Sequence, residues 1–330
     1  MKISVIIIAL NEEKALPDLL NDLSSQSYDH RQVEVILVDG LSQDRTKQIM
    51  QDYAESTDFA RVLCLDNPKA FQPCGWNVAL AHVDADVIIR LDAHARIPSD
   101  FLEKNAACIQ AGHDICGGKV MNHIAQKTRW STAVNAAEDS MFGGSVAAFR
   151  HKDQPCVVKT LAFAAYRKEV FDKVGTFNEQ LVRTEDNEMH YRMRQAGFEF
   201  YYTPEIVSSR ETRPTFRKLL RQKYLNGYWI GITLGIEPRC FSLYHFVPLA
   251  FVLSILAVTI MMFFGIMWPS AALWIAYGAA NLLMTVTAVI NDKDRNICFA
   301  LLPVMFLLLH IGYGVGTFLG VMKAIKGKNG

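Results

Sequence analysis

The chain has 330 residues, of which 51% are hydrophobic and 20% charged, and its formal net charge is +1. This composition excludes a disordered or low-complexity chain, and the near-zero charge argues against nucleic acid as a partner, because nucleic-acid binding needs a basic surface. Residues 1–240 contain 29 Lys/Arg and 31 Asp/Glu, whereas residues 241–330 contain only five and two. The sequence therefore predicts a soluble part followed by a membrane part.

The soluble part alternates short apolar runs with amphipathic segments. Residues 3–9, 33–38, 62–65 and 87–91 are β-rich runs and are predicted strands. Three helices are predicted between these strands. The first has an apolar face of Leu16, Leu19, Leu20 and Leu23, and the third covers residues 74–82. The second contains Ile49, Met50 and Tyr53 and has Asp44 and Thr46 as candidate caps. This alternation predicts an α/β fold, a parallel or mixed sheet with helices on both faces.

Polar residues stand where these strands end, and ligands of such sheets bind at the carboxyl ends of the strands. The strand-end residues are Asn11, Glu12, Asp39, Asp66, Asn67 and Asp92. No Gly-x-Gly-x-x-Gly turn follows the first strand and no P-loop occurs, which disfavours a dinucleotide oxidoreductase and a P-loop ATPase. Strand-end carboxylates suit a nucleotide diphosphate that arrives with a divalent cation.

Asp92 and Asp39 are the two carboxylates with the most specific predicted chemistry. Asp92 can hold Mg²⁺ or Mn²⁺, and His94 points to the same side of the extended chain and favours Mn²⁺. Asp39 can accept a hydrogen bond from a base or a ribose. The alternative for each is a turn role, in which Asp92 binds loop amides and Asp39 forms an Asx turn before Gly40.

The segment 184–188 reads Thr-Glu-Asp-Asn-Glu and precedes a predicted helix. A carboxylate there can act as the general base for an acceptor hydroxyl, and the adjacent acids Glu185 and Asp186 can share a raised pKa. The alternative is structural, with Thr184 capping the helix and the acids stabilised by its dipole.

The membrane part contains three uncharged runs. Residues 241–290 lack Asp, Glu, Lys and Arg and can form two spans with a turn at residues 268–270, and a third run covers residues 297–322 after a short charged loop. Seven Lys/Arg and two acids between residues 210 and 239 place the soluble part in the cytoplasm. The seven cysteines form no Cys-x-x-Cys pair, which fits reduced cytoplasmic thiols, and residues 3–10 with their flanks do not form a signal peptide.

The charges at the end of the chain conflict with this orientation. Three full spans would put the tail outside, whereas Lys323, Lys326 and Lys328 favour the inside. A re-entrant or broken third run resolves the conflict, and Pro303 and several glycines permit one, so the side of the tail stays open. Residues 213–235 interleave basic and aromatic residues beside the first span, which predicts an interfacial helix. The predicted domains are residues 1–209, a basic amphipathic segment 210–240 and a membrane region 241–330.

Taken together, five segments resemble the family 2 glycosyltransferases, which have the GT-A nucleotide-sugar fold. The segments are residues 5–12, 38–46, 90–95, 161–178 and 184–197. The chain is most similar to the succinoglycan-type group of bacterial exopolysaccharide enzymes. The resemblance implies an inverting displacement at the anomeric carbon of a nucleotide sugar, with UDP or another nucleotide leaving, and a divalent metal, Mg²⁺ or Mn²⁺, as cofactor.

The resemblance also implies roles for individual residues. The nucleoside would be bound by Asp39, Asn11 and Glu12, the nucleotide sugar by Asn77 and Arg90, and the metal by Asp92 and His94. The catalytic base would be Asp186 with Glu185. The acceptor side would contain residues 163–166, and Gln222 and Trp229 would lie at the acceptor or the membrane interface. Two departures matter. His94 stands where many relatives have a second Asp, and the Gln-x-x-Arg-Trp motif of processive synthases is replaced by the sequence from Gln222 to Trp229, which favours addition of a single sugar.

Three functions remain open on the sequence. The first is transfer of one sugar, from a UDP-sugar by preference, to a lipid-diphosphate-linked saccharide at the cytoplasmic face of the bacterial inner membrane, in exopolysaccharide or related surface-glycan synthesis. The second is a polyprenyl-phosphate sugar synthase, whose phosphate acceptor needs little help from Asp186. The third is a catalytically silent membrane scaffold of a polysaccharide assembly complex, which His94 alone supports.

Overall fold

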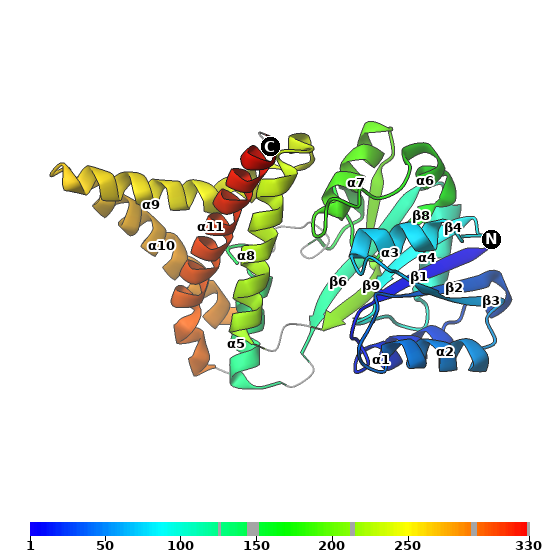
Figure 1. The fold of residues 1–330 in the computed structure, drawn as a ribbon. Helices are drawn as coiled ribbons and strands as arrows, with labels where there is room; N and C mark the ends of the chain where they lie inside the picture. Colours follow the sequence, from blue (N-terminus) through cyan, green and yellow to red (C-terminus); the bar gives the residue numbers. More distant parts are fainter. Residues whose placement is uncertain (125–126, 144–151, 212–214, 292–295, 329–330) are drawn as a thin grey trace. The chain divides into compact units, whose positions relative to one another are not determined.

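A computed structural model of the chain describes residues 1–124, 127–143, 152–211, 215–291 and 296–328. It forms two compact units. The sheet unit contains residues 1–123 and 147–211, and the helical unit contains residues 124–146 and 212–330 (Figure 1).

Among the described residues, the sheet unit is built on one mixed sheet of nine strands in the order β3-β2-β1-β4-β8-β6-β9-β5, with β7 paired to β9. The strands are β1 (Ile3–Ala9), β2 (Val33–Asp39), β3 (Arg61–Asp66), β4 (Val87–Asp92), β5 (Ala95–Arg96), β6 (Ile115–His123), β7 (Cys156–Val158), β8 (Ala165–Arg167) and β9 (Phe200–Glu211). The four predicted strands are confirmed as β1 to β4, and they pair in parallel. β8 then pairs antiparallel with both β4 and β6, which makes the sheet mixed.

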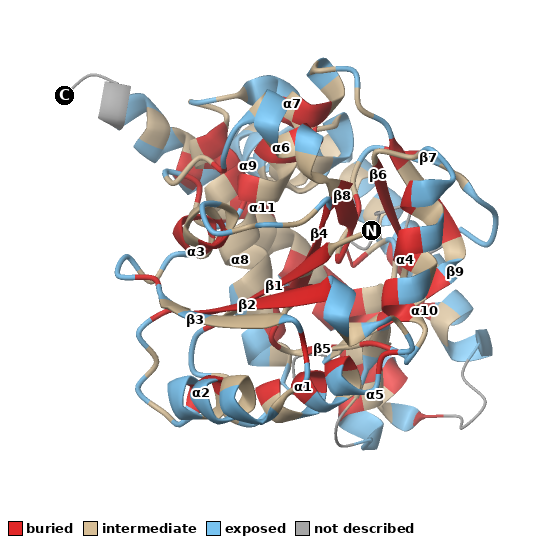
Figure 2. Cartoon of the chain, turned by 90° about the vertical axis from the view of Figure 1, so that its right-hand side faces the viewer, coloured by how far each residue is buried: buried red, intermediate tan, exposed pale blue. Residues whose placement is uncertain are grey.

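Helices cover both faces of this sheet. They are α1 (Leu16–Ser24), α2 (Thr46–Ser56), α3 (Gln72–Leu80), α4 (Phe101–Gln110), α6 (Lys168–Val174) and α7 (Glu185–Gln195). Figure 2 shows β1 and β2 as buried along their length. Alternate residues of β1 enter different cores, because Ile3, Val5 and Ile7 pack with α1 whereas Ile6 packs with Trp76 of α3. Burial on both faces explains the continuous apolar sequence of β1.

The start of α2 differs from the expected cap. Thr46 is the first helical residue, and its N–H donates to Asp44 Oδ1 at 3.0 Å. The Thr46 hydroxyl instead accepts a hydrogen bond from the Glu12 N–H at 2.8 Å. Thr46 therefore ties the loop after β1 to α2, and Asp44 alone satisfies the helix terminus.

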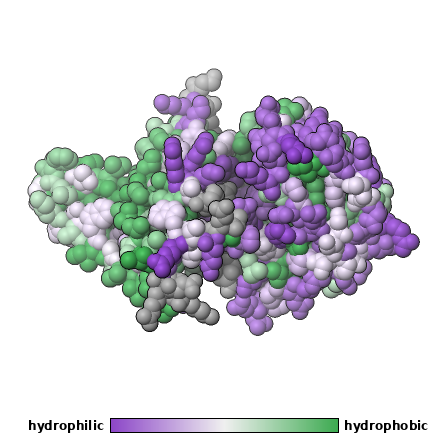
Figure 3. Space-filling model, turned by 90° about the horizontal axis from the view of Figure 1, so that it is seen from below, coloured by the Kyte–Doolittle hydropathy of each residue, from purple (hydrophilic) through white to green (hydrophobic). Residues whose placement is uncertain are grey.

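The helical unit contains α5 (Arg129–Asp139), α8 (Phe216–Thr233), α9 (Val247–Phe263), α10 (Trp268–Asn291), the 3₁₀ turn η5 (Ile297–Leu301) and α11 (Leu302–Lys328). Within the part of the chain that the structure describes, three segments are long and apolar enough to cross a membrane, namely Leu243–Phe263, Trp268–Asn291 and Ile297–Lys326. Their peak mean hydropathies are 2.5, 1.7 and 2.1. In Figure 3 the left-hand end, formed by α9 and α10, has a predominantly apolar surface.

Two boundaries differ from the sequence prediction. The turn between the first two apolar helices lies at residues 264–267, where Gly265 has φ +80°, and Trp268 already begins α10. Residues 124–146, which were expected in the first domain, belong to the helical unit. The physical reason is apolar packing, because Ala133, Val134 and Ala137 of α5 form a core with η5 and α11.

Candidate active site

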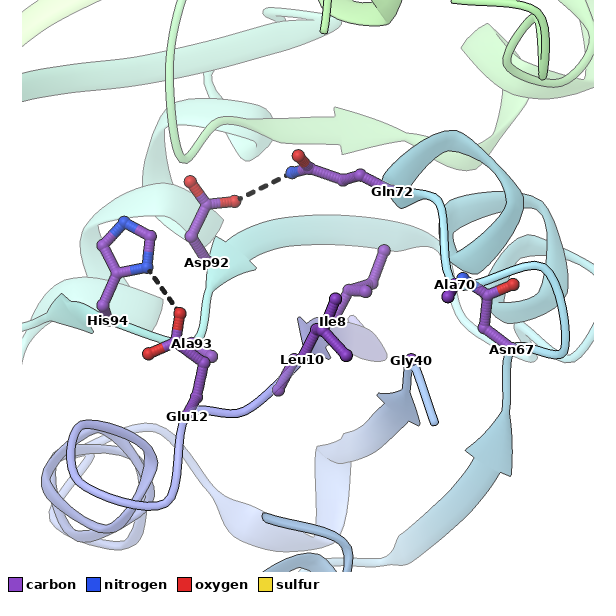
Figure 4. Close-up of a pocket in the computed structure, with 11 residues that line it drawn as sticks. Ile8, Leu10, Glu12, Gly40, Asn67, Ala70, Gln72, Asp92, Ala93 and His94 are labelled. Atoms are coloured by element: carbon purple, nitrogen blue, oxygen red, sulfur yellow. Dashed lines mark hydrogen bonds and ion pairs between the residues drawn. The ribbon is translucent and has the colours of Figure 1, made fainter. Parts of the chain in front are cut away.

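A cavity of about 220 Å³ lies at the carboxyl ends of β1, β2, β3 and β4 (Figure 4). Its lining consists of Ile8, Ala9, Leu10, Glu12, Gly40, Asn67, Ala70, Gln72, Asp92, Ala93 and His94. The predicted strand-end residues Glu12, Asn67 and Asp92 are therefore brought together at one edge of the sheet. Ala70 has φ +57°, a left-handed conformation that is uncommon for a residue with a side chain and often marks a functional loop.

Asn11 and Asp39 hold the loops around the cavity and do not line it. Asn11 Oδ1 accepts from the Gln43 N–H at 2.8 Å, and the Asn11 N–H donates to Ser42 Oγ at 2.9 Å. The Asp39 carboxylate is 2% exposed and accepts from the Ser42 N–H at 3.1 Å. Asp39 thus makes a turn contact of the kind that was its alternative role, and its assignment to a base or a ribose remains a prediction.

Asp92 and His94 occupy the side of the cavity opposite Asn67 (Figure 4). Gln72 Nε2 lies 3.4 Å from Asp92 Oδ1, and His94 Nδ1 lies 3.5 Å from Glu12 Oε1. Both His94 and Glu12 side chains are 30% exposed and accessible to a ligand. Gln72 was not predicted, although its place at the start of the helix that follows the third strand could have suggested it.

These donors fit a divalent cation that is shared with a bound diphosphate. Among the residues whose placement is described, no group of three or more His, Cys, Asp or Glu side chains could enclose a metal ion. Mg²⁺ and similar ions are often held by one or two carboxylates together with substrate phosphates. Asp92, with His94 on the same side of the cavity, is a donor set of this incomplete kind, which a substrate diphosphate would have to complete.

Arg90, two residues before Asp92, joins the cavity edge to the acidic helix α7. Its guanidinium lies 4.6 Å from the ring centroid of Trp76, and Nη2 lies 3.5 Å from Glu185 Oε1. Burial alone would lower the pKa of Arg90, but the carboxylates of Asp92, Glu185 and Asp186 outweigh it and raise this pKa. Arg90 does not line the cavity, so its position supports a role behind the ligand.

Glu185 and Asp186 differ in exposure. Glu185 is 3% exposed, whereas Asp186 is partly exposed at the start of α7. Burial, reinforced by the charge of Asp186, raises the pKa of Glu185 to about 8, against the opposing effect of Arg90. Burial also raises the pKa of Asp186, whose Oδ1 accepts from the N–H and the side-chain amide of Asn187 at 2.8 and 3.0 Å. Asp186 is thus the carboxylate that a substrate can reach. Thr184 makes no side-chain capping bond to α7.

Behind this pair, a buried histidine that the sequence analysis missed links α7 to β8. His190 Nε2 lies 3.0 Å from Tyr166 Oη, and Nδ1 lies 2.8 Å from Thr160 Oγ1. Burial, with the nearby cations Arg90 and Arg194, lowers the pKa of His190 well below its usual value, so the imidazole is neutral at pH 7. Its spacing of four residues from Asp186, one helical turn, is the signal that could have identified it.

Two other predicted site positions make contacts of their own in the structure. Residues 163–166 were expected on the acceptor side, but Phe163 and Tyr166 are 5% and 3% exposed and belong to the apolar cores. Asn77 bonds to the backbone of Phe177 in both directions and to Glu179, so it fastens α3 to the loop after α6. Tertiary partners satisfy the polar groups of Asn77 that were expected to bind the ligand.

Gln222 and Trp229 lie on α8 in the helical unit. Their assignment to the acceptor therefore remains a prediction. Gln222 Oε1 is a buried oxygen without a hydrogen-bond partner among the described residues.

The raised pKa of Glu185 predicts a pH-dependent stability. Because the folded state keeps this proton to about pH 8 and the unfolded state releases it near pH 4.5, unfolding becomes easier as the pH rises between these values. We expect Glu185→Gln to remove that slope and to leave the protein at least as stable as wild type at pH 8. The measurement is the thermal unfolding midpoint of detergent-solubilised protein from pH 5 to pH 8.

A control on the same helix is Glu188→Gln, which breaks the ion pair of Glu188 with Arg192 at 2.5 Å. It should lower the midpoint and leave the wild-type slope in place. A Glu185→Gln variant with an unchanged slope would contradict the buried, protonated carboxyl.

A strand-end cavity lined by Glu12 and Asp92 is typical of the ligand sites of α/β sheets, and comparison with known proteins identifies the family. Residues 4–175 match the family described as Glycosyl transferase family 2. The chain belongs to this family and is a glycosyltransferase with the GT-A fold.

Two relatives and one solved structure illustrate the similarity. A dolichyl N-acetyl-alpha-D-glucosaminyl phosphate 3-beta-D-2,3-diacetamido-2,3-dideoxy-beta-D-glucuronosyltransferase of Methanococcus voltae is 26% identical over 97% of both chains. The succinoglycan biosynthesis protein ExoA of Rhizobium meliloti is 31% identical over 60% of both chains. The mannosyltransferase PcManGT of Pyrobaculum calidifontis, solved with GDP-Man and Mn²⁺, aligns with a TM-score of 0.61 at 16% identity, over 96% of this chain and 87% of that one. At this level of sequence identity, the similarity to the mannosyltransferase shows a shared fold and nothing more.

Proposed function

We propose that the protein transfers one sugar, with inversion, from a nucleotide sugar to a lipid-linked saccharide at the cytoplasmic face of the membrane. The observation that carries this proposal is the arrangement around Arg90, which separates two functions of the acidic residues. Asp92 faces the strand-end cavity, and the partly exposed Asp186 lies in the first turn of α7, next to Glu185, which contacts the Arg90 guanidinium. The same carboxylates raise the pKa of Arg90, so all of them lie within its electrostatic reach.

On the donor side, the cavity would receive the nucleoside diphosphate. Asp92 and His94 would hold a divalent cation, Mg²⁺ or Mn²⁺, which neutralises the charge on the leaving diphosphate. The mannosyltransferase with the similar fold was solved with Mn²⁺. That protein binds GDP-Man, so the preference for a UDP-sugar is a proposal that the experiment below must decide.

On the acceptor side, Asp186 would take the proton of the attacking hydroxyl. The cation of Arg90 opposes the effect of burial on the pKa of Asp186 and so favours the ionised, basic form of this carboxyl. Glu185 stays buried beside Arg90 and holds the guanidinium in place. The direct displacement then inverts the anomeric carbon, with no covalent intermediate on the enzyme.

The acceptor that we propose is a saccharide carried on a polyprenyl lipid. The Methanococcus voltae relative, which matches along almost the whole chain, is named for a sugar that is attached to a dolichyl phosphate. The ExoA relative is named for succinoglycan biosynthesis, which supports a role in exopolysaccharide or related surface-glycan synthesis. The apolar helices of the helical unit support a location in the cytoplasmic membrane.

The test is release of nucleoside diphosphate by detergent-purified protein. The panel contains UDP-, GDP- and dTDP-sugars with Mn²⁺, Mg²⁺ or EDTA, with and without membrane lipid extract. We expect release from one donor, stimulated by lipid extract and stopped by EDTA. Absence of release with every donor, although a suitable lipid acceptor is present, would contradict the proposal.

A second prediction isolates the metal site. Asp92→Ala should weaken nucleotide-diphosphate binding chiefly in the presence of Mn²⁺ or Mg²⁺, because the carboxylate acts through the cation. The measurement is calorimetric titration of UDP or GDP with and without metal. Asp66→Ala is the control, since Asp66 ends β3 of the same sheet and pairs with Lys47 at 2.8 Å outside the cavity. If Asp92→Ala leaves the metal dependence unchanged, Asp92 does not hold the cation.

A further inference from the structure

The packing of α8 on α11 decides a question that the charges alone leave open, namely the side of the membrane on which the chain ends. The two helices lie side by side (Figure 1). Leu220, Tyr224 and Tyr228 of α8 meet Gly312, Gly316 and Gly320 of α11, in this order. A Cβ atom at Gly316 or Gly320 would overlap the backbone oxygen of the facing tyrosine. The helices are therefore parallel and in backbone contact, which only glycine permits.

The first half of α11 is covered by α5. Leu302, Met305 and Phe306 of α11 share a core with Ala133 and Val134 of α5. Two hydrogen bonds fix this contact at both ends. Asn296 Nδ2 donates to the backbone oxygen of Arg129 at 2.6 Å, and His310 Nε2 lies 2.6 Å from the backbone oxygen of Phe142.

Neither covering helix is able to cross a bilayer. α5 has 11 residues and is about 16 Å long, against a hydrocarbon core of about 30 Å. It starts five residues after β6 and leads back to β7, so both of its ends return to the sheet unit. α8 carries the exposed basic residues Arg217, Lys218 and Arg221, and it starts four residues after β9 ends. Both helices therefore begin on the side of the sheet unit.

The chain direction also excludes a crossing by α8. If α8 crossed, α11, which is parallel to it, would have to begin on the side where α8 begins. Because α9 and α10 together cross the membrane twice, α9 begins on the same side as α11. α9 would then have to begin on the side where α8 begins, although α8 would end on the opposite side. The 13 residues between α8 and α9 form turns and short 3₁₀ segments, and such backbone does not cross lipid. α8 therefore stays on the side of the sheet unit, and so does the part of α11 that it covers.

The face of α11 away from α5 and α8 is an apolar stripe. Val304, Leu308, Leu319, Met322 and Ile325 are 40% to 56% exposed, whereas Leu302, Phe306 and Thr317 on the covered face are fully buried. An apolar stripe on one side and amphipathic helices on the other is the arrangement of an element that lies in the membrane interface.

The α9–α10 hairpin has a different environment. Its arms contact α11 through Pro248 at the start of α9, which lies against Gly314, and through the middle of α10, where Asn281 Nδ2 donates to the Pro303 oxygen at 2.9 Å. The side chains near the turn are not covered by other parts of the described chain, and Phe263 and Phe264 are 86% and 78% exposed. The hairpin leads away from the α8–α11 pair (Figure 1).

We propose that α11 lies in the membrane interface on the side of the sheet unit, with the bilayer against its apolar stripe, and that the chain crosses the membrane only twice, through α9 and α10. Lys323 and Lys326 then lie on the same side as the basic residues of α8. This topology removes the conflict between the charge of the tail and three full spans. The inference uses no part of the proposed function.

The experiment maps the two ends of the chain and the hairpin turn in the full-length protein. Three versions carry one epitope each, before Met1, after Gly330, or between Gly265 and Ile266. Each is expressed in bacteria and treated with protease in spheroplasts and in inside-out vesicles. We expect the two terminal epitopes to be degraded together in inside-out vesicles and protected in spheroplasts, and the epitope at the turn to behave in the opposite way.

Degradation of the C-terminal epitope on the side opposite the N-terminal one would overturn the proposal, because α11 would then cross. Degradation of the turn epitope together with the N-terminal one would overturn it as well, because the hairpin would not cross. Untagged protein provides a check free of insertions. Trypsin should cut after Lys323 or Lys326 in inside-out vesicles and not in spheroplasts, and the reverse result would contradict the proposed topology.

Discussion

Asp186→Asn is expected to reduce the turnover of sugar transfer by about 10²–10⁴-fold, the usual contribution of a general base. The amide has the size of the carboxylate and keeps an oxygen for the hydrogen bonds with Asn187, so the start of α7 should remain folded. Asp186 does not line the cavity that would receive the nucleotide, and nucleotide affinity should be nearly unchanged. The measurements are single-turnover transfer and calorimetric nucleotide binding on the same preparation.

Glu188→Gln is the matched control for this substitution. Glu188 lies on the same helix but pairs with Arg192, and its substitution should leave turnover close to wild type. Equal losses of nucleotide binding and transfer in Asp186→Asn would contradict the role of a base. Full retention of transfer would also contradict it and would favour a lipid phosphate as the acceptor, because a phosphate needs no deprotonation by the enzyme.

The sequence allowed the donor half of the site to be predicted because local pattern determines it. A buried strand, its end and the carboxylate that follows are adjacent in the chain, and parallel pairing brings the strand ends together at one edge. Glu12, Asn67 and Asp92 were predicted in this way and do line one cavity. The α/β sheet was predicted from the same alternation and the GT-A fold from the resemblance of five segments to the family, and both are confirmed by the family and by the sheet.

The remaining parts of the site depend on partners that are distant in the chain. Asn77 has a side-chain amide of the kind that binds ligands. The hydrogen bonds of this amide are instead made by Phe177 and Glu179, which lie 100 and 102 residues away in the chain. Arg90 and Glu185 are separated by 95 residues. No local periodicity indicates such pairs. The departure of α5 from the sheet unit is equally hidden, because its apolar stripe is typical of any amphipathic helix, whichever core it joins.

Arg90→Met is expected to destabilise the fold and to shift the pH profile of catalysis. The Arg90 side chain is 14% exposed, and its removal leaves the buried carboxyl of Glu185 without a cation. Because Glu185 is protonated below about pH 8, its carboxyl loses a hydrogen-bond donor and not the partner of an ion pair. Leaving a buried polar group unpaired in this way typically costs about 1–3 kcal/mol. Because Arg90 also lowers the pKa of Asp186 against the effect of burial, its loss should raise that pKa further. The acid limb of the pH–rate profile should move to higher pH, with lower turnover at pH 7.

Two further variants separate charge from packing at this position. Arg90→Met combined with Glu185→Gln also removes the titrating carboxyl, so its unfolding midpoint should no longer fall between pH 5 and pH 8, while the acid limb stays displaced. Arg90→Lys keeps the charge but loses the planar contact with Trp76, so the limb should return toward wild type with only partial recovery of stability. The measurements are unfolding midpoints and pH–rate profiles in detergent. An acid limb in the same place in all three variants would show that Arg90 does not set the protonation of Asp186, and Arg90 would then have only a structural role.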